Sequence, residues 1–294
     1  MLISKFYYSL KIRLKIILLI GLWISFSMFS NAQIKTIESI VLDSQSGEPI
    51  PFVNVGFLNK SVGTVSDENG FFTMAYNQNR ISENDTLQFS RIGYESTSYL
   101  IKSYLDIINN KEYITLNPYI DQLEEVLLFS GKRKKKTIGN FYDYKSEYSG
   151  YWKEKQALGG EIATKIRVKR KKSKLLNLTF KVLGSASDSI LVRVNIYKEE
   201  NKIPGKNILK KNIFHTITSK EGAEKIDLEP YNIVVSEDII VSLELVKVYG
   251  KNIGFMIRGA GTGTSFIRYI SQDIWKSYSI GMEYILETSY PLKK

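Results

Sequence analysis

The side-chain types that perform most enzyme chemistry are scarce in this 294-residue chain. It contains one histidine, His215, and no cysteine. A catalytic triad or a multi-histidine zinc site needs further partners of these types, and a thiolate nucleophile needs a cysteine. His215 lies in an alternating run with Ile213 and Ile217 on its own face, which predicts a structural role in a strand. We therefore expect no catalytic residue, no metal site, no cofactor and no enzymatic activity.

Two short motifs look like ligand sites but fit better as turns. The Gly-Ala-Gly-Thr-Gly segment at 259–263 has the glycines of a phosphate loop, but their spacing is wrong and a strand follows instead of a helix. Asp67 and Asn69 are of types that bind calcium, but the further acidic ligands of an EF-hand are absent. Carboxylate pairs for glycoside hydrolysis cannot be recognised from spacing, so we nominate none.

Aromatic side chains are the remaining candidates for ligand binding. Tyr151, Trp152 and Trp275 could stack on sugar faces. The same rings could instead pack at a sandwich edge, because each combines a large apolar body with one polar tip. The sequence favours packing, because large apolar residues usually serve the core, and leaves sugar stacking as the alternative.

Seven short apolar segments before residue 118 predict a first β-sandwich. The expected strands are 34–42, 52–57, 63–66, 71–76, 86–92, 95–101 and 112–116. The turn Asp67-Glu68-Asn69-Gly70 predicts a hairpin between the third and fourth of these, since Asn-Gly tolerates positive φ.

Four motifs in this region occur in the order and spacing of a known family. They are Val-Leu-Asp at 41–43, Gly-Glu-Pro-Ile-Pro-Phe-Val-Asn-Val at 47–55, Gly-Thr-Val-Ser-Asp-Glu-Asn-Gly-Phe-Phe at 63–72 and Ser-Arg-Ile-Gly-Tyr-Glu at 90–95. From Gln33 to Leu128 the chain closely resembles the carboxypeptidase-regulatory-like family, whose fold is a transthyretin-like or prealbumin-like, Ig-like seven-stranded sandwich. The resemblance implies a non-catalytic module, which in many TonB-dependent outer-membrane receptors precedes the plug in the periplasm.

The segment 120–128 also resembles the link between that module and the plug. A plug and barrel would need several hundred further residues with many alternating strands. We therefore expect no receptor of that kind from this chain.

The first 32 residues predict a secretory signal peptide. Four cationic residues precede an apolar run at 16–29, and Ser30-Asn31-Ala32 places small residues at the −3 and −1 positions. The mature chain would begin at Gln33. An uncleaved anchor is the alternative, but the run is shorter than the roughly 20 residues a spanning helix needs. After cleavage we expect no transmembrane segment, and a periplasmic or outer-membrane location in a Gram-negative envelope.

Positive charge is concentrated in the segment that joins the two halves of the chain. Residues 130–172 hold 14 Lys and Arg against 4 Asp and Glu. The block Lys132–Lys136 predicts a solvated interdomain linker, and contact with anionic lipid headgroups or polysaccharide is the alternative. Export argues against nucleic acid. A second block, Lys169–Lys172, falls at an expected turn between strands.

Alternation returns after Gly159 and predicts eight or nine further strands in a jelly-roll-like sandwich. The expected organisation is a signal peptide at 1–32, a first sandwich at 33–118, a connecting strand with the basic linker at 119–158, and a second sandwich at 159–294. The fold class is all-β with two β-sandwich domains. Segment 192–209 shows a short likeness to carbohydrate-associated jelly rolls.

These observations predict a non-catalytic exported protein with a binding or assembly role in the cell envelope. Its partner, an envelope protein or a glycan, is not specified by the sequence. One alternative is a carbohydrate-binding protein that acts through the second sandwich. Another is a hydrolase hidden in that domain.

Overall fold

The structure is a computed structural model that describes residues 15–16, 34–119, 132–142, 148–153, 158–250 and 252–292. Apart from Lys15 and Ile16, the predicted signal peptide lies outside the described residues, as does the segment 120–128. The described chain is built from four β-sheets, as the predicted all-β class requires. Within these residues, no helix is long and apolar enough to cross a membrane.

The chain divides into two compact units. The first comprises residues 1–35 and 76–82, and its described part includes a turn in which the N–H groups of Arg80 and Ile81 donate to the carbonyl oxygen of Asn77 at 2.9 and 3.0 Å. The second comprises residues 36–75 and 83–294 and contains most of the first sandwich and all the described strands of the second.

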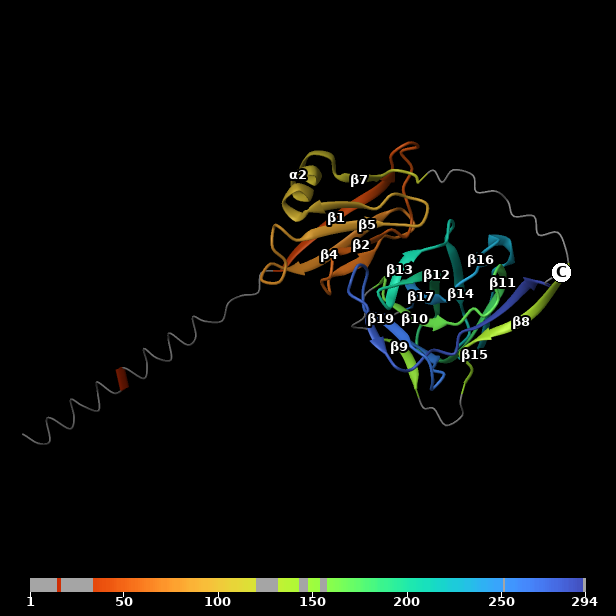
Figure 1. Cartoon of the computed structure of the whole chain (residues 1–294). Helices are drawn as coiled ribbons and strands as arrows, with labels where there is room; N and C mark the ends of the chain where they lie inside the picture. Colours follow the sequence, from red (N-terminus) through yellow and green to blue (C-terminus); the bar gives the residue numbers. More distant parts are fainter. Residues whose placement is uncertain are drawn as a thin grey trace, which may run out of the picture. The chain divides into compact units, whose positions relative to one another are not determined.

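The first sandwich has the seven predicted strands in two sheets (Figure 1). One sheet has the order β4 (Phe71–Asn77), β1 (Ile34–Asp43), β7 (Tyr113–Leu116), and the other has the order β3 (Gly63–Val65), β2 (Asn54–Phe57), β5 (Thr86–Ser90), β6 (Thr97–Leu100). Strands β1 and β7 run parallel, with Val41 opposite Ile114. Buried side chains such as Val41, Val55 and Phe89 fill the space between the sheets.

The predicted hairpin at Asp67–Gly70 is wrong. Strand β3 pairs with β2 while β4 lies in the other sheet, so this turn carries the chain from one sheet to the other. The turn itself forms as its residues indicate: Asp67 Oδ1 accepts the N–H groups of Asn69 and Phe71 at 2.8 and 2.9 Å, and Gly70 has a φ of 72°. Turn chemistry is local, whereas the partner of each strand depends on the whole sandwich.

A helix, α2 (Ile101–Lys111), lies between β6 and β7, where the sequence did not predict one (Figure 1). Ile101 and Tyr104 are its buried residues, and their i, i+3 spacing places them on one face. The Tyr104 ring stacks on Phe89 with ring centroids 6.0 Å apart. The helix ends at Glu112, whose φ of 60° is left-handed and whose N–H donates to the carbonyl oxygen of Ile108.

The second sandwich is jelly-roll-like, with two large antiparallel sheets (Figure 1). The first sheet contains, in order, β13 (Ile203–Asn207), β12 (Ser189–Glu200), β17 (Ile239–Tyr249), β10 (Glu161–Ile166), β19 (Ser265–Arg268) and β20 (Lys276–Tyr278), with β14 (Ile213–Ile217) paired to β12. The second sheet contains β8 (Arg133–Gly139), β21 (Ile285–Pro291), β11 (Ser173–Ser185), β18 (Gly254–Arg258) and β9 (Ser149–Lys153), with β15 (Gly222–Asp227) and β16 (Val234–Val235) paired to β11. A 3₁₀ turn, η1 (Glu229–Tyr231), precedes β16.

The interpretation of Lys132–Lys136 as a solvated linker is also wrong. Residues 133–139 form the edge strand β8, in which Lys134 lies opposite Tyr290 and Lys136 opposite Thr288. An edge strand needs hydrogen-bonding partners on one side only, and lysines are tolerated there because they keep the open side in water. The second basic block falls between β10 and β11, at the turn that the sequence predicted.

Candidate binding cleft

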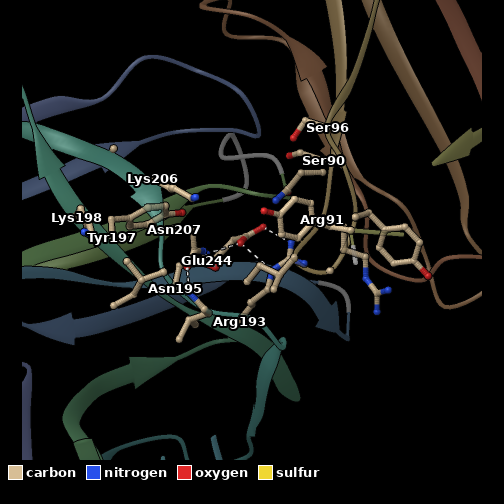
Figure 2. A pocket seen from close by; sticks show the side chains of 18 of the residues that line it. Ser90, Arg91, Ser96, Arg193, Asn195, Tyr197, Lys198, Lys206, Asn207 and Glu244 are labelled. Carbon is tan, nitrogen blue, oxygen red and sulfur yellow. Dashed lines mark hydrogen bonds and ion pairs between the residues drawn. The ribbon is translucent and has the colours of Figure 1, made fainter. Parts of the chain in front are cut away.

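A cleft rich in polar side chains is lined by both sandwiches within the second unit. Its volume is about 1030 Å³. From the first sandwich it takes residues around the end of β5, and from the second it takes residues of β12, the β13 region, β17 and the segment after β19. Figure 2 labels Ser90, Arg91, Ser96, Arg193, Asn195, Tyr197, Lys198, Lys206, Asn207 and Glu244 among its lining.

A row of four charged residues crosses four neighbouring strands under this cleft, and three of the four, Arg193, Glu244 and Arg268, line it. Arg193 lies opposite Glu244, Glu244 opposite Glu161, and Glu161 opposite Arg268. Two like charges directly opposite each other destabilise a sheet. Here the two glutamates lie in the middle of the row, and an arginine on each outer side compensates them.

The Arg193–Glu244 pair is fully buried and bidentate. Arg193 Nη2 and Nε donate to the two carboxylate oxygens of Glu244 at 2.7 and 2.9 Å, and both side chains are 1% exposed. Asn195 Nδ2 adds a third donor at 2.7 Å, and Figure 2 shows both donors directed at Glu244. Burial alone would raise the pKa of Glu244, but Arg193 and these hydrogen bonds hold that pKa below its ordinary value.

The second pair, Glu161 and Arg268, differs from the first because the pKa of its glutamate is raised and not lowered. Glu161 accepts from Arg268 and from the hydroxyl of Tyr197, which lies 3.0 and 2.9 Å from its two oxygens. Glu161 is completely buried, and this burial raises its pKa although Arg268 opposes the shift. Burial and the neighbouring Glu161 raise the pKa of the Tyr197 hydroxyl, which keeps it a donor. Both glutamates thus have their oxygens occupied by protein donors.

Arg193 and Asn212 also connect this network to the first sandwich. Arg193 Nη1 donates to the carbonyl oxygen of Phe52 at 3.0 Å, and Asn212 Nδ2 donates to that of Ile92 at 3.1 Å. Phe52 has a left-handed φ of 57°, and its ring packs on Phe214 with centroids 5.3 Å apart. The bottom of the cleft is therefore joined to both sandwiches by hydrogen bonds and by aromatic packing.

The segment between β19 and β20 makes the other main contact with the first sandwich. Ser271 Oγ donates to Asn54 Oδ1 at 2.6 Å, and Gln272 Nε2 donates to Ser90 Oγ at 2.7 Å. Gly56 and Gly63 are register partners on β2 and β3, and a Cβ on either would overlap the carbonyl oxygen of Ser271. The close approach of this segment therefore requires glycine at both positions.

Cations and one indole ring form much of the remaining wall. Trp275 packs edge-on against Tyr197, with centroids 5.8 Å apart, and the Arg268 guanidinium lies 4.9 Å from its ring centroid. Arg91 has a buried Nε without a hydrogen-bond partner among the described residues. Burial and the nearby Arg193 lower its pKa. Lys206 on β13 is exposed at the rim.

The structure separates the three predicted ligand-binding aromatics. Trp275 lines the cleft. Tyr151 is 39% exposed on β9, in the other sheet of the second sandwich, and is not among the cleft residues. Trp152 is 1% exposed, stacks on Phe255 with centroids 5.2 Å apart and donates from Nε1 to the carbonyl oxygen of Gly160. Its role as a sugar platform is therefore a wrong prediction, because alternation along β9 turns its ring into the core.

The charged row was not predicted from the sequence. Its signal is a single charge within an otherwise apolar strand: Arg193 in Leu-Val-Arg-Val-Asn-Ile, Glu244 in Val-Ser-Leu-Glu-Leu-Val and Arg268 in Ser-Phe-Ile-Arg-Tyr-Ile. A charge on such a strand must be paired if it is buried. The strand order that pairs these residues cannot be read from local pattern.

The other sequence motifs give no further site. His215 lies on β14 as predicted, and its Nε2 is 2.9 Å from Glu224 Oε2. Residues 259–263 join β18 to β19, so a strand does follow the glycines. Among the described residues, no three His, Cys, Asp or Glu side chains are grouped so that they could hold a metal ion.

Fold and cleft together define an all-β protein with two sandwiches and a polar site between them. Residues 39–128, which include most of the first sandwich, match the family model of the CarboxypepD_reg-like domain. The second sandwich lies outside this match.

No curated protein matches the chain. Among solved structures, that of the infectious bursal disease virus Gt strain is 10% identical with a TM-score of 0.28, covering 87% of this chain and 79% of that one. A structure described as the infectious bursal disease virus VP2 subviral particle is 11% identical with a TM-score of 0.26, covering 81% and 59%. One of carbohydrate-binding modules from the β-sandwich superfamily is 10% identical with a TM-score of 0.22, covering 84% and 99%.

Proposed function

We propose that this chain is a non-catalytic protein exported to the Gram-negative cell envelope, where it binds a partner in the cleft between its two sandwiches. The observation that carries the proposal is the charged row beneath the cleft, which Arg193 links to the first sandwich through Phe52. A site whose two walls are joined in this way is positioned in advance, which lowers the entropic cost of binding.

The state of the two buried glutamates supports a binding role over catalysis. A general acid or nucleophile must reach its substrate, whereas Glu161 and Glu244 have donors on both oxygens. Their carboxylates serve to neutralise Arg193 and Arg268 under the cleft. The exposed part of the wall, with Trp275 and Lys206, offers contacts typical of recognition.

The proposed location rests on the first domain and on the N-terminal residues. A CarboxypepD_reg-like domain at residues 39–128 suits an interaction or spacer module, and the predicted signal peptide at 1–32 would direct export. The two together support a periplasmic or outer-membrane-associated position. The proposed partner is an envelope protein.

Crosslinking within envelope fractions tests this proposal. A photoreactive phenylalanine analogue at Ser96, which is exposed and lines the cleft, should yield a discrete adduct with one envelope protein. The matched control carries the same group at Thr73, an exposed position on β4 that is not among the cleft residues. Recovery of only the uncrosslinked chain from both variants, or of the same adducts from both, would contradict the proposal.

Carbohydrate binding is the second candidate, and the position of Trp275 favours it. An indole ring on the wall of a polar cleft can stack on a sugar, with amide groups such as those of Asn195 and Asn207 nearby. In that case Trp275→Ala should weaken retention on an immobilised polysaccharide without unfolding the protein. Retention equal to that of the wild type would exclude this candidate.

A hydrolase is the third candidate that the sequence left open, and its acid or base would have to be a carboxylate that lines the cleft. Turnover on a panel of glycans and esters that is lost in Glu244→Gln would support it. A panel without turnover would contradict it.

A further inference from the structure

We infer that the two basic segments, Lys132–Lys136 and Lys169–Lys172, form one site that docks the protein on an anionic phospholipid surface. The sequence pointed to the first segment alone as a contact for an anionic surface. The structure adds the second segment and a reason for the two to act together. The inference does not depend on what the cleft binds.

The two segments are in direct contact although 32 residues separate them in the chain. Arg133 Nη2 donates to the carbonyl oxygen of Lys172 at 3.0 Å, and Arg133 Nε donates to Ser289 Oγ at 2.7 Å. Across the sheet, Lys135 lies opposite Ser289, which lies opposite Lys174. The first segment and the end of the second therefore occupy one end of the same sheet.

The backbone of the second segment is held by hydrogen bonds. Ser173 Oγ donates to the carbonyl oxygen of Arg170 at 2.7 Å, and the Lys172 N–H donates to Ser236 Oγ at 3.0 Å. The Arg170 guanidinium lies 5.4 Å from the ring centroid of Tyr290, on the strand beside β8. Both segments thus present their lysines from an ordered framework.

These lysines are exposed, and all but one of them have no carboxylate partner among the described residues. Of the first segment, Lys135 pairs with Glu287 at 3.1 Å. Six others have no carboxylate partner among the described residues: Lys132, Lys134, Lys136, Lys169, Lys171 and Lys172. Lysines elsewhere in the second sandwich do pair, as Lys165 does with Glu199 and Lys198 with Glu237. Like charges on two segments that touch each other repel one another, and a polyanion would relieve that repulsion.

Protection of the sheet edge explains only half of this patch. Lysines on β8 hinder pairing with another strand at the open edge. Lys169, Lys171 and Lys172 lie in a turn that offers no such edge, so the same reason does not apply to them. Lysine is also a compact charge on a flexible stem that suits a fluid array of phosphates, whereas arginine suits fixed bidentate geometry.

Cosedimentation with lipid vesicles tests the inference. The wild-type protein should bind vesicles of phosphatidylglycerol and phosphatidylcholine, should not bind vesicles of phosphatidylcholine alone, and should be released by salt. One variant carries Lys132→Gln and Lys134→Gln, and a second carries Lys169→Gln and Lys171→Gln. Each should lower the partition coefficient roughly 25-fold, since each lysine near the surface contributes about fivefold.

The control variant carries Lys102→Gln and Lys111→Gln on α2, two exposed lysines whose loss changes net charge equally. It should bind nearly as well as the wild type, and the comparison requires that all the proteins have the same N-terminus and the same unfolding temperature. Equal losses in the control and the test variants would mean that net charge alone attracts the protein. A loss in the first variant only would exclude a joint site, and absence of vesicle binding, with or without retention on an acidic polysaccharide, would overturn the inference.

Discussion

Arg193 Nη1 donates a hydrogen bond to the carbonyl oxygen of Phe52 at 3.0 Å, and this contact joins the second sandwich to the first. The same guanidinium forms the bidentate pair with Glu244. One buried side chain therefore neutralises a carboxylate in its own sheet and fixes the backbone of the other domain. Loss of the Arg193 side chain should therefore remove both the buried ion pair and the hydrogen bond between the two sandwiches.

Replacing Arg193 with methionine should destabilise the protein strongly. The change leaves Glu244 buried without its cation, which costs about 3–5 kcal/mol of unfolding free energy. Urea denaturation followed by intrinsic fluorescence would measure the loss. The double variant Arg193→Met/Glu244→Leu should recover much of it, because no charge is then left unpaired. If the double variant loses the sum of the two single effects, the two residues are not coupled as the structure indicates.

The same pair predicts a pH dependence. The pKa of Glu244 in the folded protein lies below its ordinary value, so its ionised form stabilises the fold above the unfolded-state pKa of about 4.3. That stability is lost as the pH falls through the lower folded-state value. Glu244→Gln should therefore be less stable than the wild type by a constant amount near neutral pH, and the gap should narrow below about pH 4. A gap that stays constant to pH 3 would contradict this assignment.

The docking of Ser271 on Gly56 and Gly63 can be measured with introduced cysteines, since the chain has none of its own. Ser61 Oγ and Asp273 Oδ2 lie 3.2 Å apart across this contact. The variant Ser61→Cys/Asp273→Cys should form a disulfide on mild oxidation. Adding Gly56→Val should slow that reaction about tenfold or more, because overpacking costs about 1–3 kcal/mol.

Gly184→Ala provides the control for this experiment. A Cβ at Gly184 would meet its nearest atom at 3.9 Å, which is ordinary contact. The disulfide should form in that background at the parental rate. Equal rates in the valine and alanine backgrounds would show that the glycine pair does not control docking.

The two tryptophans should respond differently to truncation. Trp152→Ala should cost about 3–5 kcal/mol of stability, because its indole is fully buried against Phe255. Trp275→Ala should cost less, since the ring is only partly buried at the cleft wall. Thermal unfolding of both variants measures the contrast, and similar losses would place Trp275 in the core.

Export can be tested at the N-terminus. Expression in a Gram-negative host should yield a mature chain that begins at Gln33, as N-terminal sequencing or intact mass would show. Ala32→Arg should block cleavage, because the −1 position requires a small residue. A purified chain that retains residues 1–32 would favour the uncleaved anchor.

The sequence predicted the strands better than their partners. Alternation and turn residues located the seven strands of the first sandwich, and the Asp67 turn forms its expected hydrogen bonds. Those signals are local, so they could not show that β3 and β4 belong to different sheets. Helix α2 was not predicted because only two of its residues, Ile101 and Tyr104, are buried. Two apolar positions are too few to distinguish a helix from the end of a strand.

The site was harder to predict because it depends on pairing between distant strands. Arg193, Glu244, Glu161 and Arg268 come from four strands that span more than 100 residues of chain, and each looks like an isolated charge in its own segment. Trp275 was nominated by residue type, which identifies aromatic rings but does not tell a buried ring from an exposed one. Trp152 was nominated in the same way, but its ring is 1% exposed and lies in the core.

The edge strand β8 also determines how the two domains are tethered. Because residue 133 already belongs to the second sandwich, only 12 residues, 120–131, separate the last described residue of the first domain from Lys132. Twelve residues span at most about 43 Å even when fully extended, so the two domains cannot separate further than that. Contacts such as Arg193 with Phe52 therefore need only weak intrinsic affinity to keep the cleft walls together.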